Sequence, residues 1–80
     1  MEQAKYNQMQ GMLTKLEDIK NSQESIIDKV NHVITDLFQN PNKKLEKGME
    51  ELHQTASDTI EKINLLVEDY ELKFNKAQQS

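Results

Sequence analysis

Residues 37–44 read Leu-Phe-Gln-Asn-Pro-Asn-Lys-Lys and contain the only proline of the chain, Pro41. Proline lacks a backbone N–H, and it disfavours the α-helical region for the residue before it, here Asn40. We therefore expect a first helix to end at about Gln39. Asn40 is then a suitable cap for a second helix, with Pro41 at the first helical position. A connection this short makes the two helices antiparallel neighbours.

On the N-terminal side of this turn, apolar residues recur at alternating intervals of three and four residues, which is the heptad pattern of a coiled coil. The first helix has Met9, Leu16, Gln23, Val30 and Leu37 at position a, Met12, Ile19, Ile26 and Val33 at position d, and Tyr6, Leu13, Ile27 and Ile34 at position e. Three neighbouring columns of this helix are therefore mostly apolar.

The C-terminal side repeats the pattern less regularly. The second helix has Met49, Ala56, Ile63, Tyr70 and Ala77 at a, Leu45, Leu52, Thr59, Leu66 and Lys73 at d, and His53, Ile60, Val67 and Phe74 at e. A face three columns wide is too broad for a single facing helix to cover. The sequence predicts an all-α, coiled-coil-like antiparallel hairpin that completes a three- or four-helix bundle by self-association or with a partner.

We expect one domain over residues 1–80, with the first helix at about 8–39, the turn at about 40–42 and the second helix at about 43–75. Residues 1–10 and 76–80 are rich in Gln, Asn and Lys, and we expect both tails to fray.

The composition limits what so small a domain can do. Of 80 residues, 35% are hydrophobic, and a single core of this size seldom supplies more than about 3–5 kcal/mol, so a protein partner or a homo-oligomer is expected. The ten basic residues are all lysines and face fourteen acids, giving a net charge of −4. Without arginine the chain lacks the bidentate phosphate ligand, and we expect no nucleic-acid partner. Without cysteine it has neither disulfides nor thiolate metal sites.

No apolar run reaches the roughly 18 residues that cross a bilayer, and no basic stretch followed by an apolar segment opens the chain. We expect a soluble chain without a secretory signal peptide and without direct membrane insertion. Its compartment is then the cytoplasm, or it is exported by a route that needs no signal peptide.

The residues that could carry chemistry are scattered. His32 and His53 have no Glu-x-x-His or His-x-x-x-His neighbours, and the carboxylate pairs are adjacent in sequence, so on a helix they point in different directions. No serine follows a glycine-rich elbow. We expect no enzymatic activity, no cofactor, no metal and no small-molecule substrate.

Gln23 and Thr59 interrupt the apolar columns near mid-helix. A polar residue at an a position can fix the register or the oligomer number of a bundle, or it can lie beside a wet spot. In a hairpin folded at Asn40, neighbouring residue numbers sum to about 81, which places Gln23 level with Asp58 and Thr59. The sequence therefore predicts a polar layer halfway along the hairpin.

The segment 63–74 is apolar almost all round, because Leu65 and Leu72 stand at position c, outside the a, d and e columns. We predict that a partner docks there; alternatively the register drifts and both leucines join the bundle core. The predicted interface comprises Leu16, Ile19, Ile26, Val30, Ile63, Leu65, Leu66, Val67, Tyr70, Leu72 and Phe74.

An acidic helical hairpin of this length resembles the WXG100 or ESAT-6-like proteins of type VII secretion, which pair into four-helix bundles. The chain departs from that family at Phe38-Gln39-Asn40-Pro41, where the family has Trp-x-Gly, and at Phe74, where an acidic residue would follow Tyr70 in the export signal. It also resembles the needle subunits of type III secretion, whose mid-chain turn contains Asn-Pro as in Asn40-Pro41. Its polar end, residues 76–80, departs from the apolar C-terminus of those subunits.

The sequence thus favours a non-enzymatic protein–protein interaction module that acts as an adaptor, a chaperone or a secretion partner. One alternative is a structural subunit of a secretion apparatus that polymerises through heterologous contacts. Another is a small acidic inhibitor whose carboxylates stand in for phosphates.

Overall fold

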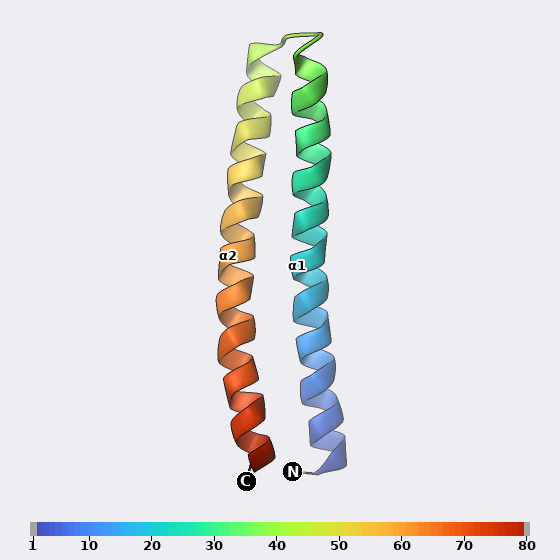
Figure 1. The fold of residues 1–80 in the computed structure, drawn as a ribbon, viewed down its shortest axis with the longest axis vertical. Coiled ribbons are helices and arrows are strands. Elements are labelled where there is room, and N and C mark those ends of the chain that lie inside the picture. The colour runs from blue at the N-terminus through green and yellow to red at the C-terminus, as the bar shows by residue number, and fades with distance from the viewer. Residues whose placement is uncertain (1, 80) are drawn as a thin grey trace.

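The structure, a computed structural model, describes residues 2–79 and consists of two long antiparallel helices. Helix α1 spans Gln3–Leu37 and helix α2 spans Lys43–Gln79, joined by the short turn of residues 38–42. The molecule measures 58 × 16 × 13 Å. The start of α1 lies next to the end of α2, at the opposite end of the molecule from the turn (Figure 1). The prediction of an all-α hairpin is confirmed.

The turn differs in detail from the prediction. Helix α1 ends at Leu37, and the N–H of Asn40 still donates to the carbonyl of Asp36 at 3.1 Å. Helix α2 begins at Lys43, and its cap is Asn42, whose Oδ1 accepts the backbone N–H of Leu45 at 3.0 Å. The prediction that Asn40 caps the second helix was wrong. The backbone N–H of Asn40 bonds to the last turn of α1, and α2 begins only at Lys43.

Both helices continue into the tails that were expected to fray. Residues 3–10 and 76–79 are helical, while residues 1 and 80 lie outside the described part. The physical reason is packing at the open end of the hairpin. The rings of Tyr6 and Phe74 lie with centroids 5.3 Å apart, and Met9 is buried one turn further in. Aromatic contacts of this kind stabilise the first turn of α1 and the last turns of α2.

The contact between the helices uses positions a and e, and we call this contact the seam. Its buried and half-buried members in α1 are Tyr6, Met9, Leu13, Leu16, Lys20, Gln23, Ile27, Val30, Ile34 and Leu37. In α2 they are Met49, His53, Ala56, Ile60, Ile63, Val67, Tyr70, Phe74 and Ala77. A pair of helices covers two columns on each, so the third apolar column, at position d, remains outside the seam.

The ends of the columns explain why e and not d enters the seam. At the open end, position d holds Lys5 and Lys73, whereas position e holds Tyr6 and Phe74. A seam built from d would force two ammonium groups together out of water, which is costly, whereas the e column brings two rings into contact. The a and e columns include one lysine, Lys20, which is half-buried near mid-helix.

The side-chain hydrogen bonds are local. The hydroxyls of Thr14, Thr35 and Thr55 each donate to the carbonyl four residues earlier, at 3.0–3.1 Å, and the Gln54 amide donates to Asp58 at 2.9 Å. Such bonds stay within one helix, so they do not join α1 to α2. The hairpin is stabilised by apolar packing along the seam.

The ring pair also gives the register. Because Tyr6 meets Phe74, neighbouring residue numbers sum to about 80 at the open end, within one residue of the predicted sum of about 81. The Thr59 hydroxyl donates to the Thr55 carbonyl at 2.9 Å. The hydroxyl of Thr59 is satisfied within its own helix, and the polar layer around Gln23 stays a prediction.

Candidate interaction surface

The d columns that the seam leaves out form an exposed apolar surface, which we call the apolar flank. Six of its side chains are 41–50% exposed, and Val33 is half-buried. Its members are Met12, Ile19, Ile26 and Val33 of α1 and Leu45, Leu52 and Leu66 of α2. Exposed apolar residues arranged in a continuous patch mark interaction sites more often than scattered ones do.

The two d columns lie on the same side of the hairpin. In an antiparallel pair, positions that flank the seam equivalently face each other across one side. A shallow hollow near the open end is direct evidence, because Lys5 and Met12 of α1 line it together with Lys73 of α2. With a register sum of about 80, the two columns interleave, and together they extend for about 30 Å at 1.5 Å per residue.

Lysines border this flank. At position g, next to d and further from the seam, α1 carries Lys15 and Lys29, and α2 carries Lys62 and Lys76, all exposed. We call these four residues the rim lysines. Lys5 and Lys73 add two more positive charges at the end of the d columns, whereas Asp36 and Asp69 are the acids at d and g. Six lysines against two aspartates give this side of the molecule a net charge of +4, although the chain as a whole is acidic.

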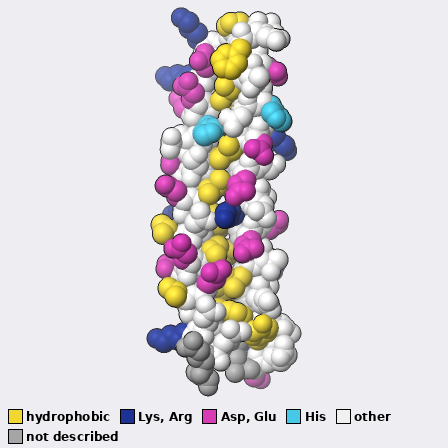
Figure 2. Space-filling view, viewed as in Figure 1, with side chains coloured by type: hydrophobic (Ala, Val, Ile, Leu, Met, Phe, Trp, Pro, Cys, Tyr) yellow, Lys and Arg dark blue, Asp and Glu magenta, His cyan; other side chains and the backbone are white. Residues whose placement is uncertain are grey.

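The opposite side, at positions b and f, is polar and acidic, and we call it the acidic flank. Its exposed carboxylates are Glu17, Glu24, Asp28, Glu50, Glu61, Glu68 and Glu71, and two lysines, Lys43 and Lys47, accompany them. Figure 2 shows one face of the molecule, on which hydrophobic side chains form a narrow line between the helices with carboxylates to both sides. The two flanks of the hairpin therefore differ in both polarity and charge.

The structure distributes the predicted interface residues over three surfaces. Ile19, Ile26 and Leu66 lie on the apolar flank. Leu65 and Leu72 lie on the outer side of α2, where they are 62% and 69% exposed and do not join the seam. The remaining six pack in the seam: Leu16, Val30, Ile63, Val67, Tyr70 and Phe74. The segment 63–74 is thus divided, because its a and e residues pack between α1 and α2 whereas Leu65, Leu66 and Leu72 stay exposed, and docking of a partner on these leucines stays a prediction.

Sequence reasoning missed the separation of charge between the two flanks. It considered the net charge of −4 and not how the charges are distributed over the two sides, because the columns were assigned relative to a seam that included d. Once a and e form the seam, the lysines at g and the carboxylates at b and f fall on opposite sides. The spacing of Lys15 from Lys29, and of Lys62 from Lys76, by two heptads was the available signal.

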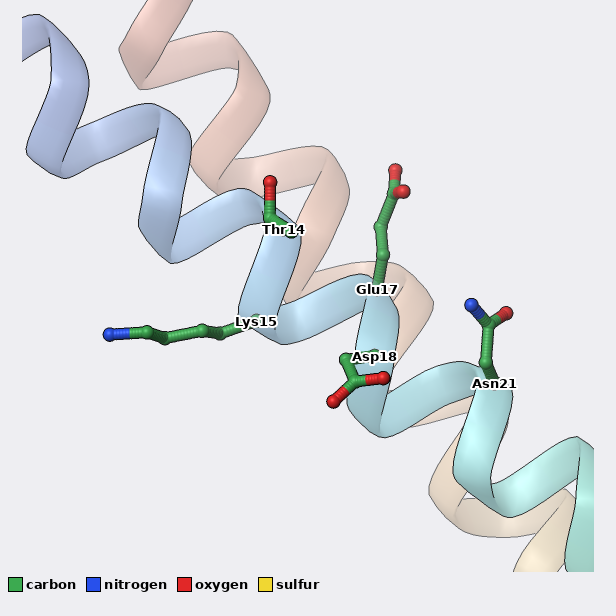
Figure 3. A pocket seen from close by; sticks show the side chains of 5 residues that line it. All are labelled: Thr14, Lys15, Glu17, Asp18 and Asn21. Carbon is green, nitrogen blue, oxygen red and sulfur yellow. The ribbon is translucent and has the colours of Figure 1, made fainter.

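Two further surface hollows are each lined by residues of a single helix. One is lined by Thr14, Lys15, Glu17, Asp18 and Asn21 of α1, and another by Glu68, Glu71, Leu72 and Asn75 of α2. In Figure 3 the five α1 side chains fan outward, with Thr14, Glu17 and Asn21 on one side and Lys15 pointing away from them. Side chains of one helix surface do not enclose a ligand as a binding cleft does.

Residues 2–79 contain neither a cluster of metal ligands nor a helix suited to span a membrane. No group of three or more His, Asp or Glu side chains there is arranged to hold a metal ion. Neither α1 nor α2, as far as they are described, is long and apolar enough to cross a membrane.

Comparison of the chain with protein-family models, with curated proteins and with solved structures finds no significant match.

Proposed function

We propose that the chain is a non-enzymatic protein–protein interaction module that binds through its apolar flank, in the role of an adaptor, a chaperone or a secretion partner. The observation that carries the proposal is the pair of d columns, left exposed side by side when the hairpin closes. They are regular in spacing and aligned along the molecule, as the unfilled side of a larger helix bundle would be.

Energetics support the same proposal. Burying the exposed half of a Leu, Ile or Met side chain contributes on the order of 1 kcal/mol, so covering the apolar flank contributes several kcal/mol. A two-helix core in so short a chain supplies only a similar amount. Binding through this flank would therefore add substantially to the stability of the hairpin as well as hold the partner.

A polymerising subunit is the second candidate, because the outer leucines, Leu65 and Leu72, form another apolar surface that faces away from the seam. Two separate apolar surfaces on one molecule permit heterologous contacts between copies, and such contacts build an open filament when they do not close into a ring. Light scattering over a range of concentrations separates the two functions. A polymerising subunit gains mass continuously, whereas an interaction module reaches a fixed mass.

Site-specific photo-crosslinking in cells that produce the protein tests the main proposal. A photoreactive amino acid is placed at Ile26 or Leu52 on the apolar flank, and at Asp28 or Gln54 two positions further along each helix as matched controls. All four positions are exposed, so each tolerates the change. We expect discrete crosslinked species from Ile26 and Leu52 and not from the controls.

The proposal fails if all four positions give the same crosslinks, or if Ile26 and Leu52 give none. A second variant, Ile26→Ser with Leu52→Ser, keeps the seam intact and should remain helical by circular dichroism. It should no longer form the complex that the unaltered chain forms.

A further inference from the structure

We propose that the occupant of the apolar flank is a single amphipathic helix of another protein, with an apolar stripe along its centre and acidic residues on both margins. This inference rests on the proposed function and specifies the partner of the same surface. It follows from the width of the apolar flank and from the charge of its borders.

The width of the apolar flank matches one helix. Each helix of the hairpin contributes one apolar column, and the next column outward, at position g, is polar or charged, as at Lys15 and Lys62. A helix lying along the groove between α1 and α2 presents its own a and d residues to those two columns, as in a three-helix bundle. The columns interleave for about 30 Å, which corresponds to a docked helix of about three heptads.

The borders determine the charge of the partner. The margins of a helix in this groove lie beside the rim lysines: Lys15 and Lys29 along one side and Lys62 along the other, with Lys76 beyond the docked stretch, toward the open end. Acidic residues on both margins complement this arrangement, whereas basic margins place like charges next to one another. Complementary borders also favour the apolar flank over the acidic flank during encounter, since the two sides of the hairpin carry opposite net charge.

A second copy of the chain fits the flank less well. Two hairpins joined through their apolar flanks would bring two sides of net charge +4 together, and the rim lysines of both would crowd the margins. An acidic lipid surface would accept the lysines. However, helices that bind lipid present a broad apolar face with aromatic residues, whereas here the face is aliphatic and interrupted by Thr59.

The test uses two synthetic helical peptides of about three heptads, both with Leu and Ile at their a and d positions. The first carries Glu at e and g, and the second carries Lys there. Titration into the full chain is followed by calorimetry, and the mass of the complex by light scattering. We expect the Glu peptide to bind one to one and at least about tenfold more tightly than the Lys peptide at low salt, with the difference shrinking as salt screens the charges.

Matched variants assign the binding to this surface. Lys29→Glu with Lys62→Glu should abolish the preference for the Glu peptide, whereas Lys47→Glu, on the acidic flank, should preserve it. Ile26→Ser with Leu52→Ser should abolish binding of the peptide. Leu65→Ser with Leu72→Ser, on the outer side of α2, should not change it.

Three results would overturn the inference. Equal binding of both peptides shows that the surface does not select acidic margins, and binding of neither shows that it does not take an amphipathic helix of this kind. A stable dimer that Ile26→Ser with Leu52→Ser dissociates, and that the Glu peptide cannot displace, shows that the flank takes a second copy. Co-sedimentation with phosphatidylglycerol vesicles, without binding of the Glu peptide, shows that it takes a lipid surface.

The photo-crosslinking experiment separates this inference from the proposed function. If Ile26 and Leu52 still crosslink to a protein while the Glu peptide shows no preference, the flank is an interaction surface with a different partner chemistry. If the crosslinks are absent as well, both the proposed function and this inference fail.

Discussion

A single side chain determines where α2 begins. Asn42 accepts the backbone N–H of Leu45 at 3.0 Å, which satisfies one of the free donors in the first turn of the helix. Asn40 lies two residues earlier and has the same side chain, but it belongs to the end of α1. Two identical residues around one proline therefore have different roles, and local sequence alone did not separate them.

Replacing Asn42→Ala should lower the free energy of unfolding by about 1 kcal/mol, because the amide that caps the first turn of α2 is removed. Asn40→Ala is the control, and we expect it to change the stability much less. Urea denaturation followed by circular dichroism measures both. Equal losses in the two variants would show that Asn42 is not the cap.

Gln23 is half-buried in the seam. Gln23→Leu should raise the free energy of unfolding by about 1 kcal/mol, because an apolar side chain of similar size replaces an amide between the helices. Glu24→Leu, on the exposed acidic flank, is the matched control and should have little effect. If Gln23 fixes the oligomer number, the variant should also change the mass measured by light scattering. Unchanged melting together with unchanged mass would exclude this role.

Each helix by itself is a long amphipathic element, and the heptad pattern was sufficient to predict that both exist. The pattern also predicted that two helices alone would leave apolar surface in water, as the apolar flank now does. The heptad pattern did not determine which two of the three apolar columns form the seam between the helices. That choice depends on the whole length of both helices at once, and above all on whether Lys5 with Lys73 or Tyr6 with Phe74 come together at the open end.

Each helix contains one glycine, which destabilises a helix relative to alanine. Gly11 and Gly48 have no positive backbone φ, and a Cβ added at either position meets nothing within 4 Å. Gly11→Ala and Gly48→Ala should therefore each stabilise the hairpin by roughly 0.5–1 kcal/mol, because alanine loses less conformational freedom on entering a helix.

The two alanine substitutions lie in different helices and far apart along the hairpin, so their effects should add in the double variant. Urea denaturation of the two single variants and the double variant measures this. A loss of stability at either position would show that the helix backbone there needs glycine for a reason other than space.

At the scale of the whole molecule, the hairpin is a rod one helix pair thick, with little interior. Five apolar side chains are buried within residues 2–79: Met9, Val30, Ala56, Ile63 and Phe74. A core this small leaves the stability sensitive to anything that covers the apolar flank. Shape and fold were therefore predictable from the sequence, whereas the candidate site was predicted only in part. The apolar flank consists of the columns that the seam leaves out, so its residues can be named only once the seam residues are known.

We expect the helicity and the melting temperature of the free chain to rise when the apolar flank is covered. Circular dichroism and light scattering on the same samples, over a wide range of concentration, measure this. A rise in melting temperature that accompanies a fixed multiple mass would show that copies of the chain cover one another. A melting temperature independent of concentration, with monomeric mass, would show that coverage must come from another protein.

The start of α1 and the end of α2 lie side by side, next to the ring pair of Tyr6 and Phe74, while the turn lies at the far end of the 58 Å axis. Each level of the seam touches only the levels directly above and below it, as in a stacked array. Tension applied between the start of α1 and the end of α2 therefore breaks the seam contacts one level at a time. The helices separate first at the ring pair and last at the turn. The rod offers little mechanical resistance in that direction, and it can be opened progressively from one end without the whole seam breaking at once.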